Sequence, residues 1–137
     1  MPWLETQIRW IMILSGALTC TMLYAAVAPE AALTSNFGSS LTGPVADVVV
    51  RNWAVLIGLM GLLLVYGAFD ASVRRVVLLV AGTSKLAFIA LVLTYGQELL
   101  RHQVRVAVIV DAAWVLVFAT YLLGTRGARP EPRRDLP

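Results

Sequence analysis

Four long apolar stretches alternate with short polar segments along the chain. They predict helices over about 8–28, 45–69, 76–95 and 104–123, because a helix needs about 20 apolar residues to cross a bilayer. The second, third and fourth stretches are joined by short segments, which makes these helices antiparallel neighbours. The sequence therefore predicts an all-α, integral membrane four-helix antiparallel bundle that occupies residues 1–123 as a single domain.

The longest polar segment, 29–44, separates the first two apolar stretches and is rich in Ser, Thr, Gly and Pro, which favour turns and loops. Leu33, Phe37 and Leu41 recur within it at a spacing of four residues. This spacing is compatible with a segment that lies along the membrane surface. A plain extracytoplasmic loop is the alternative.

Composition excludes several functional classes. Of the 137 residues, 59% are hydrophobic and 14% are charged, whereas typical soluble chains carry about 25% charged residues. Four membrane spans leave only short loops and two tails, so there is no room for a soluble catalytic domain. The single cysteine, Cys20, excludes an internal disulfide, and the single histidine, His102, argues against a histidine-rich metal site. We assign no catalytic, metal-binding or cofactor-binding residue from the sequence.

The positive charges predict how the chain sits in the membrane. The net charge is +3, but most arginines flank apolar stretches, as in membrane proteins, so we expect no nucleic-acid partner. Seven arginines lie in the first segment, the 70–75 turn and the C-terminal tail, against three on the other side. Because cytoplasmic segments carry the excess of Lys and Arg, both termini are predicted to be cytoplasmic. The arginine- and proline-rich tail, 124–137, is predicted to be disordered.

A few charges interrupt the apolar stretches. Lys85 lies roughly 14 Å into the third helix, near the middle of the bilayer, and Asp111 lies roughly 8–10 Å below the outer edge. A charge at the bilayer centre costs about 2.5–3.5 kcal/mol, so such residues face the bundle interior or find partners. Arg51 lies in the outer part of the second helix, and Asp47, four residues earlier, can pair with it.

We therefore expect Arg51, Lys85 and Asp111 to converge on the bundle axis in its outer half. The polar residues expected nearby are Ser84, Thr83, Tyr24, Thr19 and Thr21. One interpretation is a buried ion pair that fixes how the helices dock. The other is a site for a ligand, a proton or an ion. Two cations beside one carboxylate would leave a local positive excess, which suits an anionic head group or a quinone oxygen.

Small residues form a stripe on the second helix, at Ala54, Gly58 and Gly61. In lipid, such stripes let helix backbones approach closely. We interpret the stripe as a helix-packing surface, either within the chain or as the face of a dimer.

The chain resembles small bacterial four-helix membrane proteins of the broad DoxX-like type. The resemblance rests on Pro29-Glu30, on Asn36-Phe37-Gly38, on Arg51 opening a glycine-rich helix, and on an acid in the last helix. It implies that Arg51 and Asp111 match the recurring interior base and acid, and that Lys85 is an addition of this sequence or of a subfamily. Some such proteins are associated with quinone-linked oxidation or with partner membrane proteins. The resemblance implies no catalytic residue.

Three functions remain open from the sequence. The first is a non-enzymatic accessory subunit, or a binder of a small lipophilic or anionic molecule such as a quinone or lipid, at the polar cluster. The second is a proton- or ion-coupled transporter or channel that acts as an oligomer. The third is a quinone-linked redox enzyme or an isomerase, with Lys85 and Asp111 as acid and base. In each case the partners are the lipid bilayer and either further copies of the chain or a larger membrane-protein complex.

Overall fold

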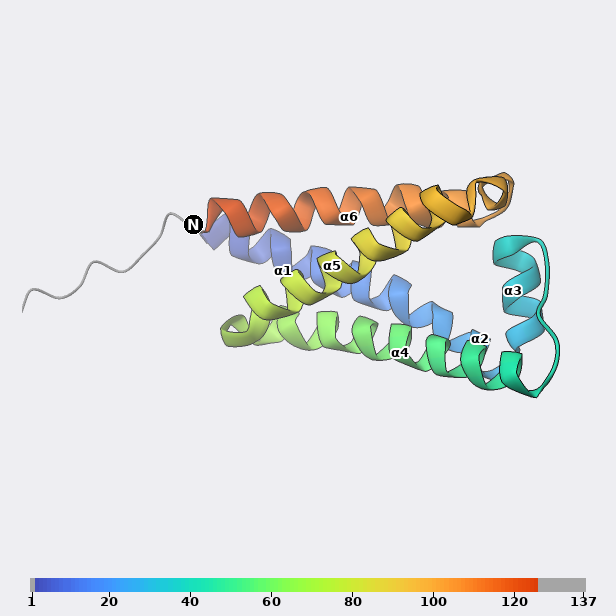
Figure 1. Ribbon diagram of the computed structural model, residues 1–137. Helices are drawn as coiled ribbons and strands as arrows, with labels where there is room; N and C mark the ends of the chain where they lie inside the picture. The colour runs from blue at the N-terminus through green and yellow to red at the C-terminus, as the bar shows by residue number, and fades with distance from the viewer. Residues whose placement is uncertain (1, 126–137) are drawn as a thin grey trace, which may run out of the picture.

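The computed structural model describes residues 2–125, and no strand occurs among them. Most of these residues are helical, as the apolar pattern predicts (Figure 1). The elements in chain order are α1 Pro2–Cys20, η1 Thr21–Leu23, α2 Tyr24–Val27, α3 Pro29–Phe37, α4 Pro44–Phe69, α5 Ala71–Tyr95, η2 Gln97–Arg101 and α6 Val104–Gly124.

Four helical stretches are long and apolar enough to cross a membrane: Glu5–Val27, α4, α5 and α6. The first of them contains most of α1, the short η1 turn and α2. The first helix begins at Pro2 rather than near 8. Of the predicted tail, Gly124 ends α6, and residues 126–137 lie outside the described part of the chain.

The third long helix begins at Ala71, about one turn earlier than the expected start at 76. Asp70 explains the difference, because its carboxylate caps the helix by accepting from the Ser72 backbone N–H at 2.9 Å and from the Ser72 hydroxyl at 2.6 Å. Arg74 then lies inside the first turns of α5 and is buried. Its guanidinium donates to the Gly67 and Ala68 carbonyls at 3.2 and 3.0 Å, which are among the unpaired carbonyls that end α4.

Because Asp70 caps α5 as a carboxylate, the stability of the folded protein should decrease at acid pH. Hydrogen bonds from Ser72, and a further one from Tyr66, hold the pKa of Asp70 below its usual value. A lowered folded-state pKa means that the stabilisation is complete above the unfolded pKa of about 3.9 and is lost as the pH falls through the folded pKa. We expect Asp70→Ala to lower the melting temperature by a constant amount near neutral pH and by progressively less below about pH 4. Thermal scans of both proteins across this range test it; an offset that persists undiminished in acid would contradict it.

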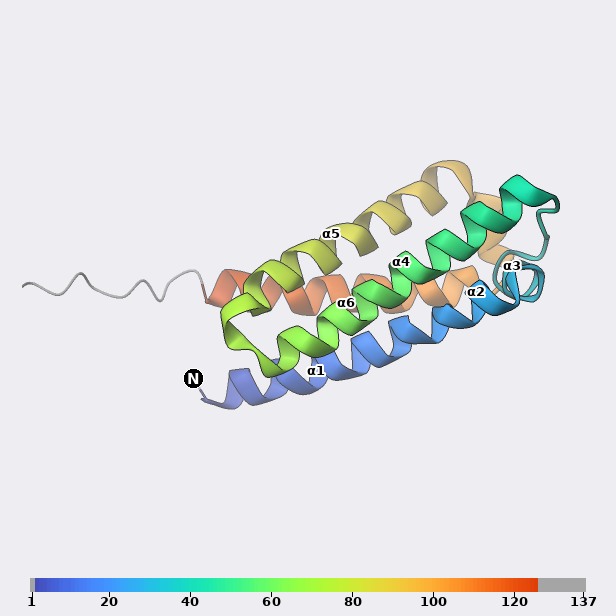
Figure 2. The same ribbon diagram turned by 90° about the horizontal axis from the view of Figure 1, so that it is seen from below.

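The four long helices lie side by side, and consecutive ones run in opposite directions (Figures 1 and 2). The N-terminal end of α1, the α4–α5 turn and the last residues of α6 lie at one end, here called the Asp70 end. The opposite end, called the α3 end, carries α3 and η2 (Figure 1). The helices pack chiefly as α1 against α4 and as α5 against α6, whereas α1 and α6 touch little.

The core lies toward the Asp70 end. It is formed by aliphatic and aromatic side chains from all four long helices, and its central members are at most 2% exposed. They are Ile8, Met12, Leu64, Ala68, Val77, Leu78, Ala81 and Phe118. These side chains fill the interior of the bundle at this end, where Ser15 and Arg74 are also buried.

The segment between the first two spans is not a plain loop, because Pro29–Phe37 forms the helix α3 across the end of the bundle (Figure 1). Pro29 is the first residue of α3, where its missing N–H costs nothing, and Gly38 ends it with a φ of 76°. Leu33 is buried, and the Phe37 ring lies 6.2 Å from the Trp53 ring of α4, centre to centre. Leu41 is exposed and belongs to the irregular part of the segment.

Candidate functional site

An ion pair joins α5 and α6 inside the bundle: the Lys85 ammonium donates to the Asp111 carboxylate. It is the only ion pair within residues 2–125, and the two side chains are only 10% and 19% exposed. Lys85 lies about 15 Å along the helix axis from Tyr95, and Asp111 about 10 Å from Val104. The offset of about 5 Å is within reach of a lysine side chain, so the two groups meet although their backbones lie at different depths.

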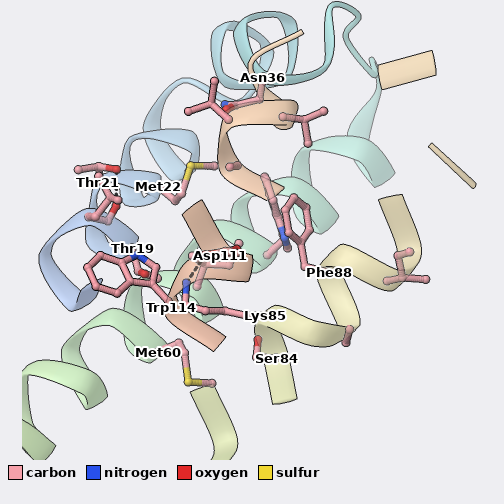
Figure 3. A pocket seen from close by; sticks show the side chains of 18 of the residues that line it. Thr19, Thr21, Met22, Asn36, Met60, Ser84, Lys85, Phe88, Asp111 and Trp114 are labelled. Carbon is pink, nitrogen blue, oxygen red and sulfur yellow. Dashed lines mark hydrogen bonds and ion pairs between the residues drawn. The ribbon is translucent and has the colours of Figure 1, made fainter. Parts of the chain in front are cut away.

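The ion pair faces a cavity of about 930 Å³ in the half of the bundle nearer the α3 end (Figure 3). All four spans contribute to its walls, together with Asn36 and Phe37 of α3. The walls are mainly apolar, and their aromatic side chains are Phe37, Trp53, Phe88 and Trp114. A volume of this size is at the upper end of the range of about 300–1,000 Å³ that is typical of small-molecule sites.

Few polar side chains reach the cavity besides the ion pair. They include Thr19, Asn36, Ser84 and Gln103, and Figure 3 shows Ser84 beside Lys85 on α5. Among all the lining residues, only Lys85 and Asp111 are ionisable. The cavity is therefore an apolar chamber with one charged pair.

The predicted polar neighbours divide between two roles. Thr19, Thr21 and Ser84 line the cavity, whereas Thr83 does not. The Tyr24 hydroxyl instead bonds to the Ser35 hydroxyl at 3.0 Å and accepts from the Asn36 amide at 3.1 Å. Tyr24 thus fastens α3 to α2 rather than joining the ion pair.

Arg51 does not join Lys85 and Asp111, contrary to the expected three-residue cluster. Its side chain is exposed and donates to the backbone carbonyls of Ala26 and Val27, the latter at 3.5 Å. These carbonyls have no partner within the helix, because the first span ends at Val27. A cation also interacts favourably with the negative end of a helix dipole. Arg51 is therefore held at the end of α2.

The predicted local pair between Asp47 and Arg51 is also wrong. Asp47 is exposed, and no ion pair forms between the two side chains. The guanidinium of Arg51 donates instead to the carbonyls of Ala26 and Val27. As a result, the cavity holds one cation and one anion, and the positive excess expected from three charges is absent from its lining.

The small-residue stripe of α4 is occupied by the first span. A Cβ atom on Gly61 would lie 2.7 Å from the Gly16 carbonyl oxygen, and one on Gly58 would lie 2.2 Å from the Leu23 side chain. Ala54 is fully buried and packs with Ala25 and Ala32. This face of α4 is consequently not free to contact a second copy, so the dimer-face alternative is wrong for it.

Two aromatic residues of the cavity were not singled out from the sequence. Phe88 follows Lys85 by three residues and Trp114 follows Asp111 by three, a spacing that places each on the same helix face as its charged neighbour. That spacing was the available signal. Arg74 is one of the arginines of the 70–75 turn, and nothing in its sequence context distinguishes it from the exposed Arg75.

Within the described residues, no three His, Cys, Asp or Glu side chains lie close enough together to hold a metal ion. The chain matches no protein-family model, no curated protein and no solved structure with which it was compared.

Proposed function

We propose that this protein binds a small lipophilic molecule with an uncharged polar group, such as a quinone or a neutral lipid, inside the membrane. The apolar walls would hold the hydrocarbon part, and Lys85 and Asp111 would bind the polar group. The observation that carries the proposal is the pairing of a cavity of about 930 Å³ with one ion pair as its only ionisable lining. The proposed role is binding rather than catalysis.

The ion pair leaves hydrogen-bonding capacity unused. A lysine ammonium has three donors, and Lys85 directs a hydrogen bond only to Asp111 among the described residues. Asp111 accepts it through Oδ1, and its Oδ2 has no partner in that part of the chain. Polar groups away from water are usually hydrogen-bonded. A ligand carbonyl or hydroxyl oxygen would accept from the Lys85 ammonium, and a ligand hydroxyl would also donate to Asp111 Oδ2.

The electrical balance of the site favours an uncharged ligand over an anion. With Arg51 bound to the end of α2, Lys85 and Asp111 compensate each other. An anionic head group would add an uncompensated charge in an apolar chamber, which is costly. The ligand that fits the site is therefore a neutral molecule with a carbonyl or hydroxyl group, and not an anion.

The packing disfavours transport or conduction. Leu78 and Ala81, about two turns and one turn from Lys85 toward the Asp70 end, belong to the closed apolar core, as does Phe118 of α6. Two further polar side chains are buried in this half of the bundle. Ser15 Oγ has no hydrogen-bond partner among the described residues, and Arg74 donates to the Gly67 and Ala68 carbonyls, so neither is hydrogen-bonded to Lys85. A binding chamber fits this arrangement better than a path through the membrane.

The proposed setting is a bacterial inner membrane, with the Asp70 end and both termini in the cytoplasm and α3 on the outer side. The arginine asymmetry of the sequence supports this orientation. The least buried of the four spans is α6, so lipid or a partner membrane protein of a larger complex would cover it. We retain the relation to DoxX-like proteins as part of the proposal.

Mass spectrometry of the gently extracted protein tests the binding function. We expect the wild type to carry a quinone or neutral lipid, and we expect the double variant Lys85→Met/Asp111→Leu to lose it by about tenfold or more, since about 1.4 kcal/mol of binding corresponds to a factor of ten. Arg75→Met is the matched control, because it removes an exposed cation outside the cavity. Equal ligand content in all three proteins would refute the proposed site.

A further inference from the structure

We propose that Lys85 can bind a lipophilic aldehyde covalently, as a protonated Schiff base with Asp111 as its counter-ion. This inference rests on the proposed function and names a reactive ligand class for the same cavity. Three observations support it: the cation in the cavity is a lysine, its amine faces apolar walls, and it contacts the Asp111 carboxylate.

Lys85 is the only lysine among the eleven basic residues of the chain. The other ten are arginines, and none of them is among the residues that line the cavity. Where only a positive charge is needed for an ion pair, arginine serves at least as well, because its planar guanidinium matches a carboxylate. Lysine differs in that its ammonium can release a proton and become a nucleophilic amine. The one cation inside the cavity is therefore the one with amine chemistry.

The surroundings of the Lys85 amine suit an aldehyde with a long apolar chain. The lysine is 9% exposed, and the space that it faces is the cavity. Residues from Trp114 to Val104 line this cavity along α6, a distance of about 15 Å. Phe88 and Trp114 provide flat apolar surfaces near the charged pair (Figure 3). An extended aliphatic or polyene chain would occupy the chamber with its carbonyl carbon at the amine.

Asp111 supplies the proton transfers that imine formation requires. The carboxylate takes one proton from the Lys85 ammonium, and the free amine attacks the carbonyl carbon to form a carbinolamine. The protonated carboxyl group returns its proton as the carbinolamine oxygen leaves as water. The product is a protonated imine beside the Asp111 carboxylate. One ammonium and one aldehyde give one iminium and one water, so neither protons nor electrons change in number.

Reductive trapping tests this inference directly. Purified full-length protein is incubated with dodecanal and cyanoborohydride, and its intact mass and peptide masses are measured. We expect one adduct, equal in mass to the aldehyde less one oxygen atom, on Lys85. The α-amino group is the only other primary amine of the chain, so peptide mapping separates the two sites. Labelling of the α-amino group alone would overturn the inference.

Two variants separate a covalent role from an ionic one. Lys85→Arg keeps a cation beside Asp111 but cannot form an imine, so the internal adduct should disappear while the fold persists. Asp111→Asn keeps the amine but removes the proton acceptor, and adduct formation should slow by about 100-fold, within the usual range for general acid–base assistance. An unchanged rate in Asp111→Asn would show that the carboxylate plays no part and would refute the proposed pair.

Dodecanol distinguishes failure of this inference from failure of the proposed function. It has the same chain as dodecanal and a hydroxyl group, but it cannot form an imine. If dodecanol protects the wild type against thermal unfolding and dodecanal gives no adduct on Lys85, the covalent inference is wrong and the binding function stands. If neither compound binds, both fail.

Discussion

Replacing Lys85 by methionine is expected to lower the free energy of unfolding by about 3–5 kcal/mol, because it leaves the Asp111 carboxylate unpaired in an apolar chamber. Removing one member of a buried pair costs much more than the pair contributes as a whole. Methionine has nearly the length of lysine, so packing changes little and the loss reports mainly on charge. Equilibrium unfolding in a lipid–detergent mixture measures it.

The double variant Lys85→Met/Asp111→Leu is the decisive partner of this experiment. With both charges removed, the destabilisation should largely disappear, because an apolar pair of similar volume is often as stable as the ion pair or more stable. Lys85→Arg controls for the charge itself and should stay within about 1 kcal/mol of the wild type. If the double variant is as unstable as Lys85→Met, the two residues do not act as a pair.

The contact between α1 and α4 gives the second large effect. A methyl group on Gly61 would lie 2.6 Å from the Cys20 sulfur, 2.7 Å from the Gly16 carbonyl oxygen and 2.9 Å from the Cys20 backbone nitrogen. Two of these three atoms belong to the backbone and cannot rotate away, so the helices must separate. We expect Gly61→Ala to destabilise the protein by about 1–3 kcal/mol, the usual cost of overpacking a tight core.

Gly82→Ala is the matched control for Gly61→Ala. Gly82 lies in the middle of α5, and a Cβ there would meet only Phe118, at 4.0 Å, which is an ordinary contact. Because alanine favours helix over glycine by up to about 1 kcal/mol, this variant should be neutral or slightly stabilising. Thermal unfolding of the two variants side by side tests the contrast. Equal stability of both would show that α1 and α4 do not meet as closely as described.

The sequence determined the four long helices because a chain in lipid can adopt few backbone structures. Apolar stretches of this length become helices, since every backbone group in lipid must be hydrogen-bonded within the segment. The positions of Lys85 and Asp111 along their helices follow from the helical rise alone. So does the offset of about 5 Å along the helix axes between the two backbones. Helix starts follow less directly from the sequence. The polar composition of the 70–75 turn predicts a start of α5 at 76, but the helix begins at Ala71 because the Asp70 side chain caps it there.

Only the tertiary structure shows which groups the Arg51 side chain binds. Its sequence context offers Asp47 on its own helix and Asp111 in another, but the structure gives it the carbonyls of Ala26 and Val27. Which acceptor a long cation reaches depends on how α4 is rotated and on where α2 ends beside it. Neither quantity is encoded in local spacing, since both result from the close packing of α1 on α4 at Gly16 and Gly61.

The sequence by itself determined four apolar helices and the positions of Lys85 and Asp111 within the last two of them. Only the tertiary structure decided that these two charges form a balanced pair facing a cavity of about 930 Å³, closed toward the Asp70 end by an apolar core. Helical periodicity and rise act within one segment, so they can be read from a chain. A cavity arises where helix pairs diverge, and that depends on side chains from all four spans at once.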